Sequence, residues 1–271
     1  MLIDPLAKKL FHQPKKHGPI ALMYHSIRTD AAGIHPDTRS PWSVSFGQFC
    51  AQLDLLQEYG WKTICVKDLA ASYNIHPKTA ILTFDDGYID NFRAFEELAK
   101  RGMCASWYVV SQDVGKSAHW KNPAISAPSM LDKAQLLSML QAGMEIGSHS
   151  RNHRRLTELT DDAMRDEVGG AKVELEDMLG EGVISFAYPY GAYNDNVLQK
   201  VKDAGYLYAC TTNSGWALRD HDPFQIRRIT IFGQDSLATF VRKLAFADND
   251  VPWWRPLGYY ASRIRARVFS G

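Results

Sequence analysis

Two short polar runs in the sequence carry residue types that could bind a metal ion and activate water. An apolar run at 79–84 is followed at once by Asp85 and Asp86, and a second apolar run is followed by His149 and His153. Two imidazoles and one carboxylate form a set that binds Zn²⁺ or another divalent ion and leaves positions open for water. Such an ion lowers the pKa of its water towards about 7, and the remaining aspartate could take the proton as a general base.

Each run also has a simple structural explanation. Asp-Asp-Gly at 85–87 is a common turn after a strand, and glycine lets the backbone turn there without steric cost. Histidines four residues apart lie on one face of a helical turn, where they are often a surface pair without a ligand. The metal-site interpretation is favoured because both runs follow predicted strands. Polar residues at the carboxyl ends of parallel strands meet at one face of the sheet.

The rest of the sequence alternates between apolar runs that predict strands and amphipathic stretches that predict helices, with Ser45, Asp132 and Thr160 as helix caps. The predicted strands are at 19–24, 61–66, 79–84, 103–110, 144–147, 183–188, 206–210 and 226–232. The predicted helices are at 45–59, 67–73, 90–101, 132–142, 161–178, 194–203 and 236–247. This alternation predicts an α/β protein of one domain, with a mainly parallel sheet that closes or nearly closes as a barrel. An open doubly wound sheet is the alternative.

The composition is that of a soluble globular protein, with 45% hydrophobic and 23% charged residues in a chain of 271. A formal net charge of +1 argues against binding to nucleic acid. We expect three regions: a basic N-terminal extension at 1–18, the main domain at 19–247 and a basic, aromatic tail at 248–271. Basic ends on an acidic middle are typical of proteins that work near an anionic surface such as a membrane.

No apolar stretch reaches the length of a membrane span, and the first residues lack the apolar core of a signal peptide. We therefore expect a cytoplasmic protein, either free or peripheral to the inner membrane. The four cysteines are widely spaced and form no CxxC pattern. They are interpreted as small buried apolar residues in a reducing compartment, rather than as disulfides or a zinc knuckle.

Three motifs, TFDDG at 83–87, HSRNH at 149–153 and FAYPYG at 186–191, resemble those of the NodB-homology polysaccharide deacetylases, carbohydrate esterase family four. The likeness is greatest to the branch that acts on poly-N-acetylglucosamine. It implies a distorted (β/α)₇ barrel and one divalent metal ion, Zn²⁺ first, with Co²⁺ or Ni²⁺ as alternatives. It also implies an N-acetylated glycan as substrate.

Carried over residue by residue, the resemblance makes Asp85 the general base. The implied metal ligands are Asp86, His149 and His153. The backbone N–H of Tyr190 would bind the oxyanion of a tetrahedral intermediate.

The sequence departs from the family pattern at two catalytic positions. The third motif usually carries an arginine that holds the catalytic aspartate, but Ala187 stands there. Arg227 or Arg228 could supply the guanidinium, with Arg228 preferred, and a surface arginine at a strand end is the alternative. The late Leu-x-His motif, whose histidine protonates the leaving amine, is absent. His25 could replace it, unless it has a purely structural role.

Two aromatic residues are candidates for substrate binding. Trp216 either forms a wall of the acetyl pocket or packs in the core, and Tyr188 belongs to the third motif. The leading hypothesis is a metal-dependent hydrolase that releases acetate from an N-acetylated sugar, including a lipid-linked glycan at a membrane. The alternatives are a carbohydrate-binding protein that kept the metal site but lost catalysis, and a hydrolase of another non-peptide C–N bond.

Overall fold

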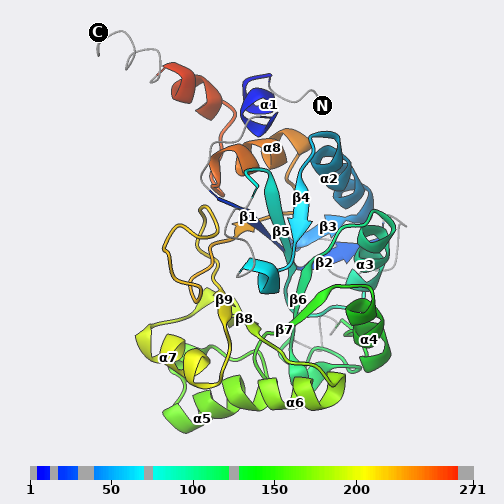
Figure 1. Ribbon diagram of the computed structural model, residues 1–271, viewed down its shortest axis with the longest axis vertical. Coiled ribbons are helices and arrows are strands. Elements are labelled where there is room, and N and C mark those ends of the chain that lie inside the picture. The colour runs from blue at the N-terminus through cyan, green and yellow to red at the C-terminus, as the bar shows by residue number, and fades with distance from the viewer. Residues whose placement is uncertain (1–4, 13–17, 30–39, 70–75, 122–127, 262–271) are drawn as a thin grey trace.

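The structure is a computed structural model, and it describes residues 5–12, 18–29, 40–69, 76–121 and 128–261. Within these residues eight strands form one curled sheet in which every pairing is parallel (Figure 1). Their spatial order is β10 (Ile229–Thr230), β1 (Ile20–Tyr24), β5 (Thr79–Phe84), β6 (Ser106–Val109), β7 (Glu145–Ser148), β8 (Ser185–Ala187) and β9 (Tyr208–Cys210), with β4 (Lys62–Ile64) beside β5.

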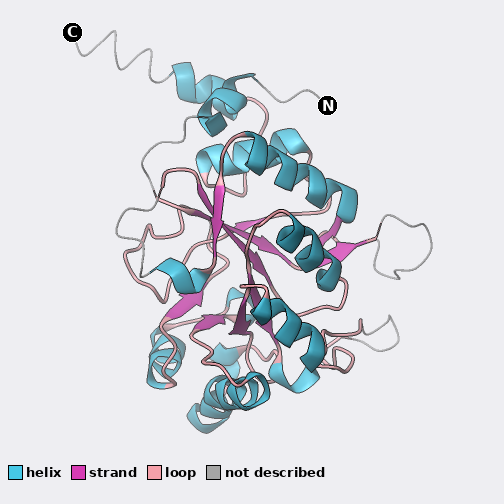
Figure 2. Ribbon diagram, turned by 45° about the vertical axis from the view of Figure 1, so that its right-hand side comes forward, coloured by secondary structure: helices cyan, strands magenta, loops and turns pink. Residues whose placement is uncertain are grey.

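Helices cover the outside of this sheet, and Figure 2 shows the strands enclosed by them. They are α1 (Pro5–His12), α2 (Phe46–Glu58), α3 (Asn91–Lys100), α4 (Lys133–Gln141), α5 (Asp161–Arg165), a π-helical turn (Asp166–Gly170), α6 (Ala171–Leu179), α7 (Asp195–Asp203) and α8 (Leu237–Phe246). Short 3₁₀ turns lie at Val66–Leu69, Ser111–Asp113, Leu156–Glu158 and Pro189–Gly191. The predicted caps Ser45, Asp132 and Thr160 each accept a hydrogen bond from a backbone N–H of the first turn.

The central strand β5 has one strand on one edge and two on the other. On one edge β1 pairs with it from Ala80 to Phe84. The other edge is shared, because β4 pairs with 79–81 and β6 pairs with 83–84. The end of β4 and the start of β6 therefore meet beside the middle of β5.

A short segment at 226–230 joins the two ends of the curled sheet. Ile226 forms a parallel bridge with Cys210 of β9, and β10 pairs with β1 through Ile229 and Thr230. The predicted single-domain (β/α)₇ barrel is thereby confirmed, and the open doubly wound alternative is wrong.

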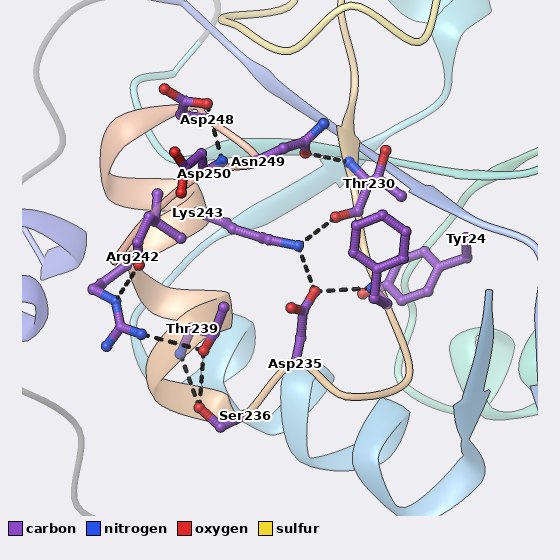
Figure 3. Close-up of polar contacts among 12 residues, drawn as sticks. Tyr24, Thr230, Asp235, Ser236, Thr239, Arg242, Lys243, Asp248, Asn249 and Asp250 are labelled. Atoms are coloured by element: carbon purple, nitrogen blue, oxygen red, sulfur yellow. Dashed lines mark hydrogen bonds and ion pairs between the residues drawn. The ribbon is translucent and has the colours of Figure 1, made fainter. Parts of the chain in front are cut away.

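Helix α8 anchors this closing segment (Figure 3). The buried Lys243 donates hydrogen bonds to the Thr230 carbonyl at 2.8 Å and to the Asp235 carboxylate at 2.5 Å. Asn249 accepts a hydrogen bond of 2.9 Å from the Thr230 N–H. A strand of only two residues is thus fixed from its outer side by side chains of the last helix and the turn after it.

Alternate strand residues supply two apolar clusters, one under the helices and one inside the barrel. Leu22, Leu82 and Phe84 belong to the cluster under the helices, where the Phe84 ring stacks on Trp107 at 4.7 Å. The cluster inside the barrel contains Ala21, Ile81, Tyr108, Ala187 and Cys210. Several of these inner residues are small, which leaves volume inside the barrel for a polar side chain.

Three element predictions need correction. No strand is predicted at β2 (Ser26–Arg28) or β3 (Ser43–Ser45), which form a separate pair of parallel strands. The predicted strand 226–232 is reduced to two residues, because 226 pairs with one neighbour and 229–230 with another. Of the predicted helix 67–73, residues 66–69 form a 3₁₀ turn, and the rest lies outside the described residues.

In Figure 1, α1 and a helical turn at 255–261 lie at the same end of the molecule as α8. In α1 the Phe11 side chain is buried and stacks on Trp61 at 5.3 Å, so residues of the predicted extension pack on the fold. Trp253 and Trp254 are exposed. In the described ranges no helix is long and apolar enough to cross a membrane. The boundaries at 18 and 247 stay a prediction.

Candidate active site

Two acids leave the carboxyl end of β5 through a sharp turn. Asp86 and Gly87 both have left-handed backbone conformations, with φ of 75° and 84°. A Cβ on Gly87 would lie 2.9 Å from Cγ1 of Val109, so a larger residue does not fit. Asp85 and Asp86 both line one cavity of about 430 Å³ at this end of the barrel.

Asp86, His149 and His153 form a compact group of metal-type donors. One ligand atom from each residue lies within 4.8 Å of the others, and all three residues are buried. The Asp86 Oδ1 atom lies 3.5 Å from Nε2 of His149 and 3.3 Å from Nε2 of His153. The predicted ligand set is therefore brought together by the fold.

The two histidines lie on a loop, and the helical turn expected between them is wrong. Ser150 and His153 have φ of 65° and 55°, which interrupts any helix. The Ser150 hydroxyl accepts a hydrogen bond of 3.0 Å from the His153 N–H. The buried Glu167 accepts from the Asn152 N–H at 2.9 Å and braces the loop from outside. Local hydrogen bonds, rather than helical spacing, aim the imidazoles at one point.

The orientation of each imidazole is set by its neighbours. The Nδ1 atom of His149 lies 2.9 Å from the Ala187 carbonyl, which can only accept. Nδ1 therefore carries the hydrogen, and the lone pair of Nε2 faces Asp86. The His153 ring stacks on Trp120 at 4.7 Å and meets the Tyr190 ring edge-on at 4.6 Å.

These donors fit a divalent metal ion. Two imidazole nitrogens and one carboxylate oxygen are a ligand set of Zn²⁺ and of other first-row ions, and the set opens onto a cavity that could admit water and substrate. The tautomer of His149 and the buried position of Asp86 leave the required lone pairs facing one another.

Asp85 is fixed by Arg228 inside the barrel. Both side chains are buried, and the guanidinium donates two parallel hydrogen bonds of 2.6 and 2.8 Å to the two carboxylate oxygens. Arg228 also donates to the Thr211 carbonyl at 2.9 Å and to the Thr83 hydroxyl at 3.1 Å. Asp85 is thus held in one orientation by a paired, charge-assisted contact.

The charges of the site keep both aspartates ionised. Burial alone would raise the pKa of Asp85, but the Arg228 guanidinium and His149 outweigh it, and the pKa lies below its usual range. Burial likewise opposes ionisation of Asp86, yet the adjacent imidazoles of His149 and His153 hold its pKa well below the usual value. For His149, the two aspartates overcome the effect of burial and raise the pKa.

His25, Tyr188 and Tyr190 also line the cavity. The His25 ring packs against Trp42 at 4.6 Å, and its buried Nδ1 has no hydrogen-bond partner among the described residues. Tyr190 has a left-handed backbone with φ of 58° and a half-exposed ring. Tyr188 is buried, and its hydroxyl donates to the Phe224 carbonyl at 3.1 Å, so its polar group is occupied within the protein.

Trp216 does not line this cavity, which favours the second of its two interpretations, packing in the core. It packs against the core under the helices. The reason is the course of the chain after β9: the Ala217 N–H donates to the Pro19 carbonyl, at the amino end of β1 and away from the site. Arg227, the second candidate for holding Asp85, instead pairs with Asp220 at 2.6 Å.

Other residues of the cavity gave no sequence signal. Trp42, Asp90, Lys121 and Arg155 line it, yet each lies in a polar segment without a motif. Asp90 accepts a hydrogen bond of 2.5 Å from the Ser26 hydroxyl, which ties the turn after β5 to β2. These four residues are recognised as part of the site only because the structure places them in the same cavity as Asp85 and Asp86.

Comparison with known proteins agrees with this site. A family model for polysaccharide deacetylases matches residues 72–209, which contain all three metal-type donors and Asp85. The Bacillus subtilis protein YxkH is 28% identical over 78% of this chain and 70% of its own length. A poly-β-1,6-N-acetyl-D-glucosamine N-deacetylase of Staphylococcus epidermidis is 23% identical over 87% of this chain and 86% of its own, which bears out the expected likeness to that branch.

Among solved structures, the Streptococcus pyogenes deacetylase PplD, determined with acetate, superposes with a TM-score of 0.72 at 26% identity, over 83% of this chain and 97% of that one. The matched motifs, the barrel and the buried Asp-His-His group thus point the same way, and the chain belongs to the polysaccharide deacetylase family.

Proposed function

We propose that this protein removes N-acetyl groups from an N-acetylated sugar of a polysaccharide, with the help of one divalent metal ion. Asp86, His149 and His153 would hold the ion, with Zn²⁺ first and Co²⁺ or Ni²⁺ as alternatives. The observation that carries the proposal is the buried pair of Asp85 and Arg228 directly beside this donor group. A metal site alone could be structural, but a second carboxylate held ionised next to it is what hydrolysis requires.

Asp85 is suited to act as the general base. When bound, a divalent ion polarises the acetyl carbonyl and makes water easier to deprotonate. The Asp85 carboxylate stays ionised because of Arg228, so it is ready to accept the proton of the attacking water. Arg228 is a positioning residue, because its guanidinium donates one hydrogen bond to each oxygen of the Asp85 carboxylate. Attack of water on the acetamide then breaks the C–N bond and releases acetate and a free amine.

Two further residues would complete the reaction at the edge of the cavity. The backbone N–H of Tyr190 is proposed to stabilise the oxyanion, in a turn where this residue has a left-handed conformation. The leaving nitrogen needs a proton, and His25 is the candidate donor because it lines the same cavity as Asp85. Its Nδ1, which has no hydrogen-bond partner in the described part of the chain, supports a functional role over a purely structural one.

The cavity indicates how much of a glycan enters the site. A volume of about 430 Å³ suits one sugar ring with its acetamido group. The half-exposed Tyr190 ring, with the Arg155 guanidinium 4.8 Å above it, offers an aromatic face at the rim, on which a neighbouring sugar could stack. The staphylococcal relative supports β-1,6-linked N-acetylglucosamine as the first polymer to test.

Acetate release tests the proposal directly. β-1,6-linked N-acetylglucosamine oligomers are incubated with the metal-free protein and with added Zn²⁺, Co²⁺ or Ni²⁺, and acetate is measured. Asp85→Asn should abolish release while metal content stays unchanged, and His149→Ala should lose the metal. The exposed Asp162→Asn is the matched control and should behave as wild type. Turnover retained in Asp85→Asn would refute the base assignment, and no acetate with any metal would favour a binding protein.

That binding protein is the second candidate function. Its support was the alanine at 187 and the missing late histidine. The first of these is weakened because Arg228 makes the contact that the motif arginine would make. A hydrolase of another C–N bond is distinguished by its products: ammonia, or the ring-opened amino acid formed from a cyclic amide, without acetate.

We also propose that the substrate is presented at a membrane, with a cytoplasmic enzyme bound peripherally to the inner face and a lipid-linked glycan as one form of substrate. The exposed Trp253, Trp254 and Leu257 support this, since aromatic and apolar side chains prefer the membrane interface. Flotation with anionic vesicles tests it. Binding that is lost in Trp253→Ser/Trp254→Ser agrees with the proposal, and absence of wild-type binding contradicts it.

A further inference from the structure

A second group of metal-type donors lies away from the cavity. In the described part of the chain two such groups occur, and the second consists of Cys65, Asp68 and Cys104, whose ligand atoms all lie within 4.8 Å of one another. The two cysteines are far apart in the sequence and belong to no CxxC pattern, so spacing gave no sign of them. The structure describes both as free cysteines, Cys65 buried and Cys104 partly buried.

The fold creates this group at the seam between two strands. Cys65 follows β4 and Cys104 precedes β6, and these strands share one edge of β5. The Cys104 N–H donates to the Thr63 hydroxyl at 3.0 Å, which joins the two strands where neither can pair with the other along a ladder. The register places Cys104 level with Ile81, four residues before Asp85, so the group lies about 13 Å from the acids along the strand direction.

The donors are arranged before any ion arrives. The Asp68 carboxylate accepts a hydrogen bond of 2.9 Å from the Cys65 N–H, which fixes it beside the thiol. Cys65 is buried, whereas Asp68 and Cys104 are partly exposed and give a path from solvent. The neighbouring Cys65 side chain lowers the pKa of the Cys104 thiol to about 7, so part of it is thiolate at neutral pH.

We propose that Cys65, Asp68 and Cys104 form a second, thiolate-rich site for a thiophilic divalent ion such as Zn²⁺. Thiolates select such ions over Mg²⁺ or Ca²⁺. Two sulfurs on one tetrahedral Zn²⁺ lie about 3.8 Å apart, a separation that the group already allows. Each thiol that binds releases one proton to solvent, and the ion replaces the hydrogen that Cys65 now directs at the Ala105 carbonyl.

The ion would clamp the seam between β4 and β6. It binds only when Cys65 and Cys104 are together, hence only to the folded chain, and therefore raises the melting temperature by linkage. At a free concentration about 100 times the dissociation constant, we expect a rise of roughly 5–10 °C for a domain of this size. The site is independent of the proposed deacetylation.

Cadmium titration of a variant without the first site tests this inference. In the Asp86→Ala/His149→Ala protein, reduced and freed of metal, one equivalent of Cd²⁺ should bind and give the ultraviolet absorption of a cadmium thiolate. Cys104→Ser should lose this absorption and the rise in melting temperature, and Cys50→Ser, a partly exposed cysteine in α2, should keep both. Asp68→Asn keeps a hydrogen-bond acceptor for Cys65 and should weaken binding at least tenfold.

Three results would overturn the inference. They are no bound Cd²⁺ in the double variant, thiolate absorption that persists in Cys104→Ser, and equal affinity in Asp68→Asn and its parent. Circular dichroism of each variant shows that it is folded, so that loss of binding is not loss of structure. Zinc content measured by mass spectrometry, with one equivalent retained in the double variant and none after Cys104→Ser, gives the same answer without cadmium.

Discussion

Replacing Arg228 by methionine should turn Asp85 from a stabilising charge into a destabilising one. The pair is fully desolvated, with side-chain exposures of 0% and 3%. Methionine preserves much of the volume but leaves a buried carboxylate without its two charge-assisted hydrogen bonds. Loss of one partner of a buried ion pair costs about 3–5 kcal/mol, a large part of the 5–15 kcal/mol by which domains are typically stable.

The pH dependence gives this prediction its sign. In the wild type the pKa of Asp85 is below the unfolded value, so the pair contributes stability above that value and loses it as pH falls through the folded pKa. In Arg228→Met, burial dominates and the pKa rises above the unfolded value. The variant is then relatively most stable when Asp85 is protonated, and it loses stability as pH increases through the raised pKa. The difference between the two proteins should therefore shrink on acidification.

Urea unfolding of metal-free protein at about pH 4 and about pH 8 measures this difference. Adding Asp85→Asn to Arg228→Met removes the buried charge and should recover at least about 1–2 kcal/mol at the higher pH. Arg228→Lys, a point charge that cannot form both bonds, should fall between wild type and Arg228→Met. A loss below about 1 kcal/mol, or an equal loss at both pH values, would refute the reasoning.

Three further predictions concern Gly87 in the turn after β5, Trp216 and helix α8. Gly87→Ala should lower stability by about 1–3 kcal/mol and reduce acetate release, because alanine is strained at a positive φ and its Cβ would collide with Val109. A variant with wild-type melting temperature and activity would contradict this. Trp216→Leu should reduce stability, measured by urea unfolding, and leave the KM for the glycan unchanged; a raised KM at unchanged stability would return Trp216 to the substrate pocket. Lys243→Met should cost about 3 kcal/mol, because Asp235 is left buried without its cation; recovery in Lys243→Met/Asp235→Leu, followed by thermal unfolding, checks the cause.

The sequence predicted the parts of the site that local chemistry determines. A buried strand that ends in two acids and a glycine can be read from neighbouring residues, and so can helix caps such as Ser45. The contact between Arg228 and Asp85 spans 143 residues, so the sequence could offer it only as one of two arginines. The fold decides between them, because the two side chains point to opposite sides of the same extended segment. Arg227 contacts Asp220, and Arg228 contacts Asp85.

The errors have the same origin. The spacing of His149 and His153 fits a helical turn. In the structure the His153 N–H instead donates to the Ser150 hydroxyl, and Ser150 and His153 have left-handed backbone conformations. Trp216 follows a predicted strand, yet the chain there has turned back to the amino end of β1, where the Ala217 N–H donates to the Pro19 carbonyl. In each case the deciding interaction lies between segments that the sequence does not relate.

The segment that closes the barrel has a consequence for when the enzyme becomes competent. Residues 226–230 join β9 to β1, and Arg228 in their middle holds Asp85. A chain folded only through residue 209, the end of the family match, would already contain both aspartates and both histidines of the site. Asp85 would still lack the Arg228 guanidinium that fixes it. Closure of the barrel and fixation of the Asp85 carboxylate by Arg228 would therefore happen together. Local opening of residues 226–230 would separate Arg228 from Asp85 and stop hydrolysis before the rest of the fold unfolds.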